Sequence, residues 1–294
     1  MPVRTEAVMG TIVTIHVVAE TTEAEPAISR AFGWFHEIEA RCSRFLPSSE
    51  LMLLTTQPFV RVPASPILFE AVRFACMVAE ESDGAFDPAI GHRMEQRGFN
   101  REHRTGAIIR SYLNPVADVS YRDIELDPEA RTIKLRRPLT LDLGAVAKGL
   151  AVDTAAKELA PFRDFAIDAG GDLYLGGRNP QGELWSVGIR HPRKPDELVD
   201  RLIVSDQAVC TSGDYERGQH ILDPRTGEPA FAVASATVRA PGAMLADALA
   251  TATFVLGPVA GIEFLERMEV DGLMFTDNQQ VIERFETRGL RRAA

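Results

Sequence analysis

The sequence has little of what marks disulfide-bonded, zinc-binding or nucleic-acid-binding proteins. Its three cysteines, Cys42, Cys76 and Cys210, are odd in number and widely spaced, which fits neither a disulfide framework nor a zinc site. Reduced thiols in a reducing compartment are therefore expected. Basic residues are outnumbered by acidic ones, and the net charge of −10 argues against nucleic acid as a main partner because phosphate backbones attract basic surfaces.

No segment has the pattern of a signal peptide or a membrane span. Residues 1–20 place acidic side chains within a short apolar stretch and lack a cleavage site or a lipid-attachment cysteine. A cytoplasmic protein without a membrane anchor is therefore expected. The longest apolar stretch lies between positions 240 and 262, but prolines and glycines bracket only about four helical turns of it, too few to cross a bilayer.

Familiar nucleotide-binding and hydrolase signatures are also missing. The chain has no G-x-G-x-x-G, no Walker glycine pattern, no nucleophile elbow, and no repeat or linker that divides it. With 294 residues, 45% of them hydrophobic and 25% charged, it is typical of a soluble globular protein. We expect a single domain over residues 1–294, with two closely packed subdomains as the alternative.

Hydrophobic periodicity predicts an α/β (α+β) fold whose sheets are mixed but largely antiparallel and pack against helices. Apolar residues recur at helical spacing in segments 23–44, 66–82, 244–256 and 261–268. Alternating patterns predict hairpins at 123–137, 165–177 and 272–285, and further strands at 11–19, 184–190, 201–205, 208–210 and 234–239. The pair Gly170-Gly171 predicts a bulge or a close backbone approach to something bound.

The stretch 139–159 combines a short alternating run of leucines with an alanine-rich helical segment that begins at Gly144. This order predicts a strand that feeds a helix through one glycine. The free N–H groups in the first turn of such a helix suit an anion such as a phosphate.

Lys148 falls on the same helical face as Val152, Ala155 and Leu159, which is the face expected to point inward. A buried ammonium is costly unless it is paired, and Asp142 or a bound phosphate would pair it. The alternative is a surface lysine on a partly exposed helix.

Asp247 is the single charged residue between positions 240 and 262, so its carboxylate is expected to face the core. Thr251 lies one helical turn further along the same face. A carboxylate and a hydroxyl so placed suit Mg²⁺, which takes hard oxygen ligands. The alternative is a buried Asp that caps a neighbouring loop, with Thr251 bonded to its own helix.

Two loop segments carry further candidate residues. His220 closes a turn-rich segment that also contains Arg217, and it would serve as a general base near neutral pH or, alternatively, have a structural role. Segment 83–91 is full of turn-forming residues yet carries Phe86 in its middle, which indicates an ordered loop that touches a ligand.

Taken together, these stretches resemble the FAD:protein FMN transferase family, also called the ApbE family and formerly labelled thiamine biosynthesis lipoprotein. The resemblance spans nearly the whole chain in the family's order. The matching stretches are MGT (9–11), SRFLPSSEL (43–51), GAFDPAIG (84–91), LDLGAVAKGLAVD (141–153), DAGGDLYLGG (168–177), TSGDYERG (211–218), HILDPRTGEP (220–229) and ADALATATFVLG (246–257).

The resemblance implies an ApbE-like, T-fold-related fold and an enzyme that binds FAD and uses Mg²⁺. The enzyme would transfer FMN to a Thr or Ser hydroxyl of an acceptor flavoprotein with a flavinylation motif and release AMP. By the same resemblance, His220 and Lys148 are catalytic, and the metal is held by the Ala145 carbonyl, Asp247 and Thr251. The implied flavin nucleotide site comprises Met9, Phe45, Ala85, Phe86, Asp87, Asp142, Lys148 and Ile221.

Two other functions use the same residues. In an FAD pyrophosphatase, water replaces the acceptor hydroxyl and FAD gives FMN and AMP. In a non-catalytic FAD-binding protein, FAD stays intact.

Overall fold

The computed structural model describes residues 1–294 except 103–104, 112–115, 117, 216–219, 279 and 285–294. Its largest element is an eight-stranded antiparallel sheet with the strand order β1-β2-β6-β7-β10-β11-β12-β13. These strands are β1 (Val3–Val8), β2 (Thr11–Val17), β6 (Phe165–Ala169), β7 (Leu173–Gly176), β10 (Gln207–Gly213), β11 (Val233–Ala240), β12 (Asp271–Thr276) and β13 (Val281–Arg284). Every pairing between neighbouring strands is antiparallel, as the hairpin pattern predicted.

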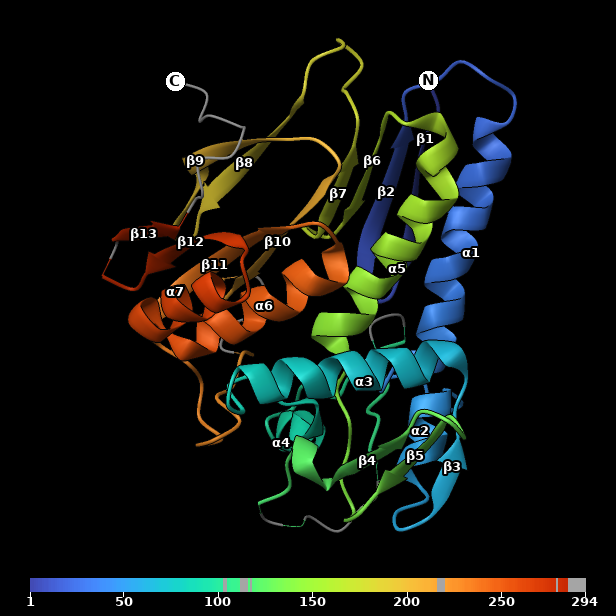
Figure 1. The fold of residues 1–294 in the computed structure, drawn as a ribbon, viewed down its shortest axis with the longest axis vertical. Coiled ribbons are helices and arrows are strands. Elements are labelled where there is room, and N and C mark those ends of the chain that lie inside the picture. Colours follow the sequence, from blue (N-terminus) through green and yellow to red (C-terminus); the bar gives the residue numbers. More distant parts are fainter. Residues whose placement is uncertain (103–104, 112–115, 117, 216–219, 279, 285–294) are drawn as a thin grey trace.

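Helices cover one face of this sheet (Figure 1). Helices α1 (Ala24–Cys42) and α5 (Gly144–Leu159) pack on β1, β2, β6 and β7, whereas α6 (Ala243–Leu256) packs on β10 and β11. Helix α7 (Pro258–Arg267) lies beside α6, and α3 (Pro66–Glu81) crosses below the N-terminal end of α5. The four helical segments predicted from periodicity are thus confirmed as α1, α3, α6 and α7.

Two smaller sheets extend from this core. One is three-stranded with the order β3-β5-β4, made of β3 (Arg61–Pro63), β4 (Ile124–Asp127) and β5 (Thr132–Leu135). It lies beyond α3 together with the short helices α2 (Glu50–Thr55) and α4 (Gly91–Gln96) (Figure 1). The other is the hairpin of β8 (Trp185–His191) and β9 (Lys194–Val204). The single-turn 3₁₀ helices are η1 (Pro88–Ile90), η2 (Tyr121–Asp123) and η3 (Ala160–Phe162).

The predicted hairpins at 123–137 and 165–177 are confirmed as β4–β5 and β6–β7. The hairpin at 272–285 is confirmed as β12–β13, although position 285 itself lies outside the described residues. Strand β1 and helix α2 were not predicted. A local signal for α2 was present, because Ser49 caps it by accepting the Met52 N–H at 3.1 Å.

The predicted strand before Gly144 is wrong. Its leucines, Leu139, Leu141 and Leu143, are at most 2% exposed, but the segment joins no sheet. Its backbone bonds instead to loop 88–91, where the Gly91 N–H donates to the Thr140 carbonyl at 3.1 Å and the Asp142 N–H donates to the Pro88 carbonyl at 2.7 Å. An extended core segment has the same alternation as a strand, so the pattern alone did not separate the two.

Helices α5 and α6 approach each other closely at Gly149. A Cβ at this position would lie 2.5 Å from the backbone of Met244, so no larger residue fits. Helix α6 is buried along most of its length, which confirms that its apolar stretch belongs to the core. Among the described residues, no helix is both long and apolar enough to cross a membrane. All three cysteines carry free thiols.

Candidate functional site

The centre of the site is Lys148, whose ammonium lies between two buried carboxylates. Its Nζ is 3.0 Å from Oδ2 of Asp247, and it forms a second ion pair with Asp172. Asp172 and Asp247 are 2% and 6% exposed, and the Lys148 side chain is 21% exposed. The alternative of a surface lysine is therefore wrong. We call Lys148, Asp172 and Asp247 the lysine cluster.

Three separate elements bring the lysine cluster together. Lys148 comes from α5, Asp247 from α6, and Asp172 from the turn of the β6–β7 hairpin. Two carboxylates share one ammonium, so the cluster as a whole carries an excess of negative charge. Because burying an uncompensated charge is costly, this excess favours a bound cation.

The residues around Asp247 fit a hard metal ion. Thr251 lies on α6 with Asp247, and its hydroxyl is 3.0 Å from the Ser212 hydroxyl of β10. Ala145 has the non-helical torsion angles φ −91° and ψ 16°, so the regular ladder of α5 is interrupted at the residue whose carbonyl the resemblance assigns to the metal. A carboxylate, a hydroxyl and a carbonyl are the oxygen donors that Mg²⁺ prefers.

Within the described part of the chain, no three or more His, Cys, Asp or Glu side chains are grouped so that they alone would hold a metal. A metal at Asp247 would therefore need further oxygen ligands from substrate and water. This is the usual situation for Mg²⁺, which is commonly completed by phosphate oxygens.

Asp172 was not predicted as a site residue. It follows Gly170-Gly171, and its carbonyl accepts the Ala169 N–H at 3.0 Å across the hairpin turn. Gly170 has φ +67° and lies against Thr11 of β2, where a Cβ would overlap the threonine hydroxyl. The close approach is therefore to a neighbouring strand of the same chain, and the predicted approach to something bound stays a prediction. The available signal was an acidic residue directly after this glycine pair.

Asp142 does not pair with Lys148, contrary to one of the two expectations for the lysine. Its Oδ2 accepts from Arg44 Nε at 2.6 Å, and its Oδ1 accepts the Gly144 N–H at 2.8 Å. The first N–H of α5 is therefore already satisfied by a side chain and is not free for an anion. Arg44 is 6% exposed and lies beside the partly buried Asp142, so its guanidinium pairs with this carboxylate.

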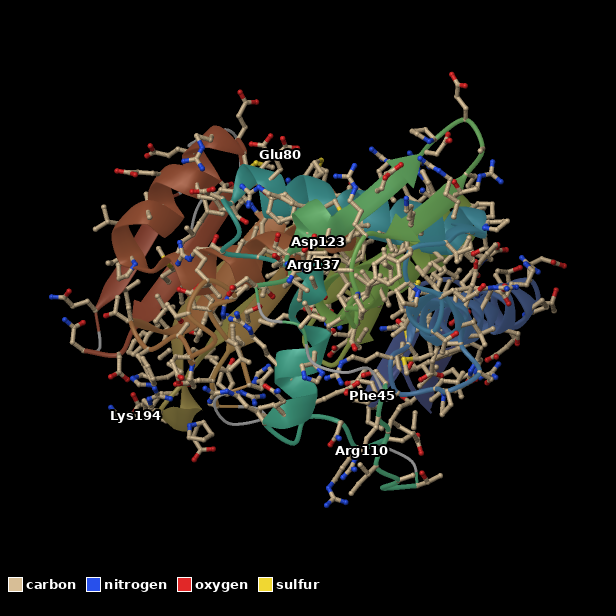
Figure 2. The ribbon with its side chains drawn as sticks, turned by 90° about the horizontal axis from the view of Figure 1, so that it is seen from below. Phe45, Glu80, Arg110, Asp123, Arg137 and Lys194 are labelled. Atoms are coloured by element: carbon tan, nitrogen blue, oxygen red, sulfur yellow. The ribbon has the colours of Figure 1, made fainter. Side chains whose placement is uncertain are left out.

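Arg44 connects several of the predicted site residues. Its Nη2 donates to the Phe99 carbonyl at 2.6 Å, and its guanidinium lies 4.1 Å from the centre of the Phe45 ring. The Phe99 ring meets the His220 ring edge to face, with centroids 6.3 Å apart. Contacts thus run from His220 through Phe99 and Arg44 to Asp142 at the start of α5. Figure 2 shows Phe45 between α4 and the N-terminal helices.

The prediction that segment 83–91 is ordered is confirmed, whereas its contact with a ligand stays a prediction. The Asp87 carboxylate accepts the N–H groups of Ala89 at 2.8 Å and Tyr121 at 3.0 Å. Burial raises the pKa of Asp87 to about 6, and these two hydrogen bonds oppose the rise. Phe86 is 6% exposed and packs into the core, and Ala85 shares a smaller apolar cluster with Ile221.

The remaining predicted residues lie in turns. Met9 has φ +53° in the turn between β1 and β2 and is partly buried against the core. The segment after His220 forms a turn closed by a bridge between Leu222 and Pro229. Arg93 of α4 holds this turn by donating to the Pro224 carbonyl at 2.7 Å. Arg217, named with His220 above, lies outside the described residues.

A cleft of about 1010 Å³ opens at the other end of α5, beside Asp153 and Gly242, and not at Lys148. Its carboxylates are taken up by backbone N–H groups: Asp164 accepts from Arg178 and Asp206 accepts from Gly177, at 2.8 and 2.9 Å. Because these acceptors serve the fold, we place the candidate site by its chemistry, at the lysine cluster.

Solved structures with this fold include ApbE proteins. The ApbE protein of Thermotoga maritima superposes with a TM-score of 0.83 at 26% identity over 96% of both chains. The flavin transferase ApbE of Vibrio cholerae has a TM-score of 0.84 at 24% identity over 97% of both chains. The fold is therefore the one these proteins share.

The sequence comparison is equally extensive. The profile of the ApbE family matches residues 9–274, and the chain belongs to this family. The FAD:protein FMN transferase of Treponema pallidum is 31% identical over 311 residues, covering 95% of this chain and 85% of that protein. The protein of the same name from Vibrio cholerae is 31% identical over 258 residues, covering 81% of this chain and 75% of that protein.

Proposed function

We propose that this protein is a Mg²⁺-dependent FAD:protein FMN transferase. It moves FMN from FAD to a Thr or Ser hydroxyl of an acceptor flavoprotein and releases AMP. The family membership and the names of the relatives support the class of enzyme. The single observation that carries the chemistry is Lys148 held between two buried carboxylates, because this arrangement joins an anion-binding ammonium to a site with excess negative charge.

The proposed reaction balances as a phosphoryl-type transfer. The acceptor hydroxyl oxygen forms a bond to the FMN phosphorus of FAD. The bond from that phosphorus to the bridging oxygen breaks, and AMP leaves with that oxygen. The hydroxyl proton passes to a base. Such transfers require mainly positioning and charge neutralisation, which the lysine cluster is suited to supply.

Lys148 would contact the pyrophosphate and offset the charge of the leaving AMP. The metal would be held by the Ala145 carbonyl, Asp247 and Thr251. When bound, Mg²⁺ supplies Lewis-acid neutralisation of the phosphate oxygens. The flavin nucleotide would be lined by Met9, Phe45, Ala85, Phe86, Asp87, Asp142 and Ile221, which come from the loops around the N-terminal end of α5.

His220 would accept the proton of the acceptor hydroxyl. Its ring is positioned by Phe99, which Arg44 ties to Asp142. His220→Gln is expected to lower the transfer rate about 100-fold, the usual size of a general-base contribution, with little change in FAD affinity. Rates of flavin transfer and FAD titrations on the same preparation would check this, and an unchanged rate would remove His220 from the mechanism.

The function is tested by incubating the protein with FAD and Mg²⁺, with and without an acceptor that carries a Ser/Thr flavinylation motif. AMP is followed by chromatography and covalent flavin by the fluorescence of the denatured acceptor. The proposal expects AMP and covalent flavin in equal amounts, only when acceptor and Mg²⁺ are both present. AMP without acceptor would instead show an FAD pyrophosphatase, and bound FAD without AMP would show a non-catalytic FAD-binding protein.

A further inference from the structure

Asp172 belongs to the lysine cluster, yet the proposed reaction gives it no role. Its carboxylate is 2% exposed and pairs with the Lys148 ammonium. The turn that carries it is held by the bond from the Ala169 N–H to its own carbonyl at 3.0 Å and by Gly170 against Thr11. The carboxylate is therefore presented from a fixed backbone and not from a mobile loop.

The single carboxylate of Asp247 would have two partners. It pairs with Lys148 at 3.0 Å, and it is the proposed carboxylate ligand of the divalent cation. A cation on Asp247 would displace the ammonium, and a partly buried ammonium without a partner is costly, more so beside a dication.

Neither of two further titratable groups, Cys210 and Asp153, would replace Asp247 as the partner of this ammonium. Cys210 lies close to Asp247 and Lys148 on β10, and burial and the Asp247 charge raise the pKa of its thiol, so it stays neutral. Asp153, further along α5, accepts the N–H groups of Ala243 and Met244 at 2.6 and 3.0 Å. Asp172 already touches Lys148 and has the charge required.

We propose that Asp172 retains the Lys148 ammonium when Asp247 turns from it to a divalent cation. Asp172 is then a positioning residue: it makes Asp247 available as a ligand and keeps Lys148 beside the pyrophosphate. This inference rests on the metal site of the proposed function. It gives a physical reason for two carboxylates around one lysine, since a single carboxylate could not pair with the ammonium and bind the cation at the same time.

The test is a double-mutant cycle on Mn²⁺ affinity, measured without FAD by the electron paramagnetic resonance signal of free Mn²⁺. The proteins are the wild type, Asp172→Asn, Lys148→Gln and the double variant. Asp172→Asn is expected to weaken Mn²⁺ binding about tenfold when Lys148 is present and several-fold less in the Lys148→Gln background, because groups that act through each other are not additive. An equal loss in both backgrounds would overturn the proposal, since Asp172 would then act on the metal without Lys148.

Asp168→Asn is the matched control. Asp168 lies on the same hairpin, is exposed, and accepts the Gly171 N–H at 2.9 Å, which an asparagine oxygen also accepts. It is expected to leave Mn²⁺ affinity unchanged, and a loss as large as that of Asp172→Asn would contradict the proposal. If Asp172→Asn alone fails to fold, the comparison of Lys148→Gln with the double variant still tests the inference. A tenfold loss of Mn²⁺ affinity between those two proteins would overturn it.

The cycle separates this inference from the proposed function. Flavin transfer together with equal Mn²⁺ losses in both backgrounds would leave the function standing and remove the role of Asp172. The expected pattern of Mn²⁺ affinities without any flavin transfer would support the role of Asp172 and contradict the proposed transferase function. A wild-type protein that binds Mn²⁺ neither alone nor together with FAD would contradict both the metal site and the role of Asp172.

Discussion

Two carboxylates lie at the contact between α5 and α6, the partly buried Asp153 and the buried Asp247, and their hydrogen-bond partners differ. Asp153 of α5 accepts the first backbone N–H groups of α6, from Ala243 at 2.6 Å and Met244 at 3.0 Å. Asp247 of α6 pairs with the side chain of Lys148 at 3.0 Å. Both acids are in the stretches that resemble the ApbE family, but only Asp247 stood out in the sequence, as the single charged residue between positions 240 and 262.

The difference lies in what each carboxylate would have to release. Backbone N–H groups at a helix start cannot leave their acceptor without exposing unsatisfied donors. An ammonium on a flexible four-carbon stem moves away at much lower cost. Asp153 is therefore expected to hold the helices together, whereas Asp247 is available to a ligand.

Asp247→Ala gives the largest effect expected from this comparison. Transfer and AMP release should fall at least about 1000-fold, because the variant loses the carboxylate ligand of the metal. The fold should persist, because Lys148 keeps Asp172 as a partner. Chromatography of AMP together with thermal unfolding measures both. Wild-type turnover in this variant would remove the metal assignment.

Asp153→Ala should show the opposite pattern. The free energy of unfolding is expected to fall by about 2 kcal/mol, because the first turn of α6 loses its cap and two N–H groups lose their acceptor. AMP release per folded molecule should stay within about twofold of the wild type. Urea denaturation and the AMP assay check the two parts. If this variant kept its stability but lost its turnover, the contrast between the two acids would fail.

Asp87 extends the comparison, because it accepts two backbone N–H groups like Asp153. Burial raises the pKa of both carboxyls, that of Asp87 to about 6. Its folded pKa is above the ordinary carboxyl value of 3.8, so between about pH 4 and pH 6 the folded state holds the proton more tightly than the unfolded chain. The contribution of Asp87 to the free energy of unfolding therefore falls by about 2 kcal/mol as pH rises from about 4 to about 6.

Asp87→Asn should remove this contribution. Urea denaturation of the ligand-free wild type and variant at pH 4 and pH 7 gives the difference between them at each pH. The free energy of unfolding of the wild type is expected to fall relative to that of the variant as pH rises. A difference that is the same at both pH values would show that the Asp87 carboxyl is not held in this way.

Much of the fold was predictable from local pattern. The helical period of α1, α3 and α6 and the alternation of the β4–β5 hairpin are strong because each element buries one face or, in α6, nearly its whole surface. The inward orientation of the Lys148 side chain and the burial of Asp247 followed from the same periodicity, and both are confirmed.

The partners of these groups were not predictable in the same way. Asp142 is only six residues before Lys148, yet it pairs with Arg44, which the chain brings from the end of α1. The partner that Lys148 actually has, Asp172, comes from a hairpin on the large sheet. Such choices depend on tertiary packing, which places distant segments side by side, and local pattern carries no information about them.

The central claim is that the lysine cluster and a cation on Asp247 together hold the FAD pyrophosphate. It is tested most directly by determining the structure of the protein crystallised with FAD and Mg²⁺. We predict the pyrophosphate between the Lys148 ammonium and a cation bound by Asp247, with Lys148 still against Asp172. FAD bound elsewhere, for example in the cleft beside Asp153, with Lys148 and Asp247 still paired to each other, would contradict the account.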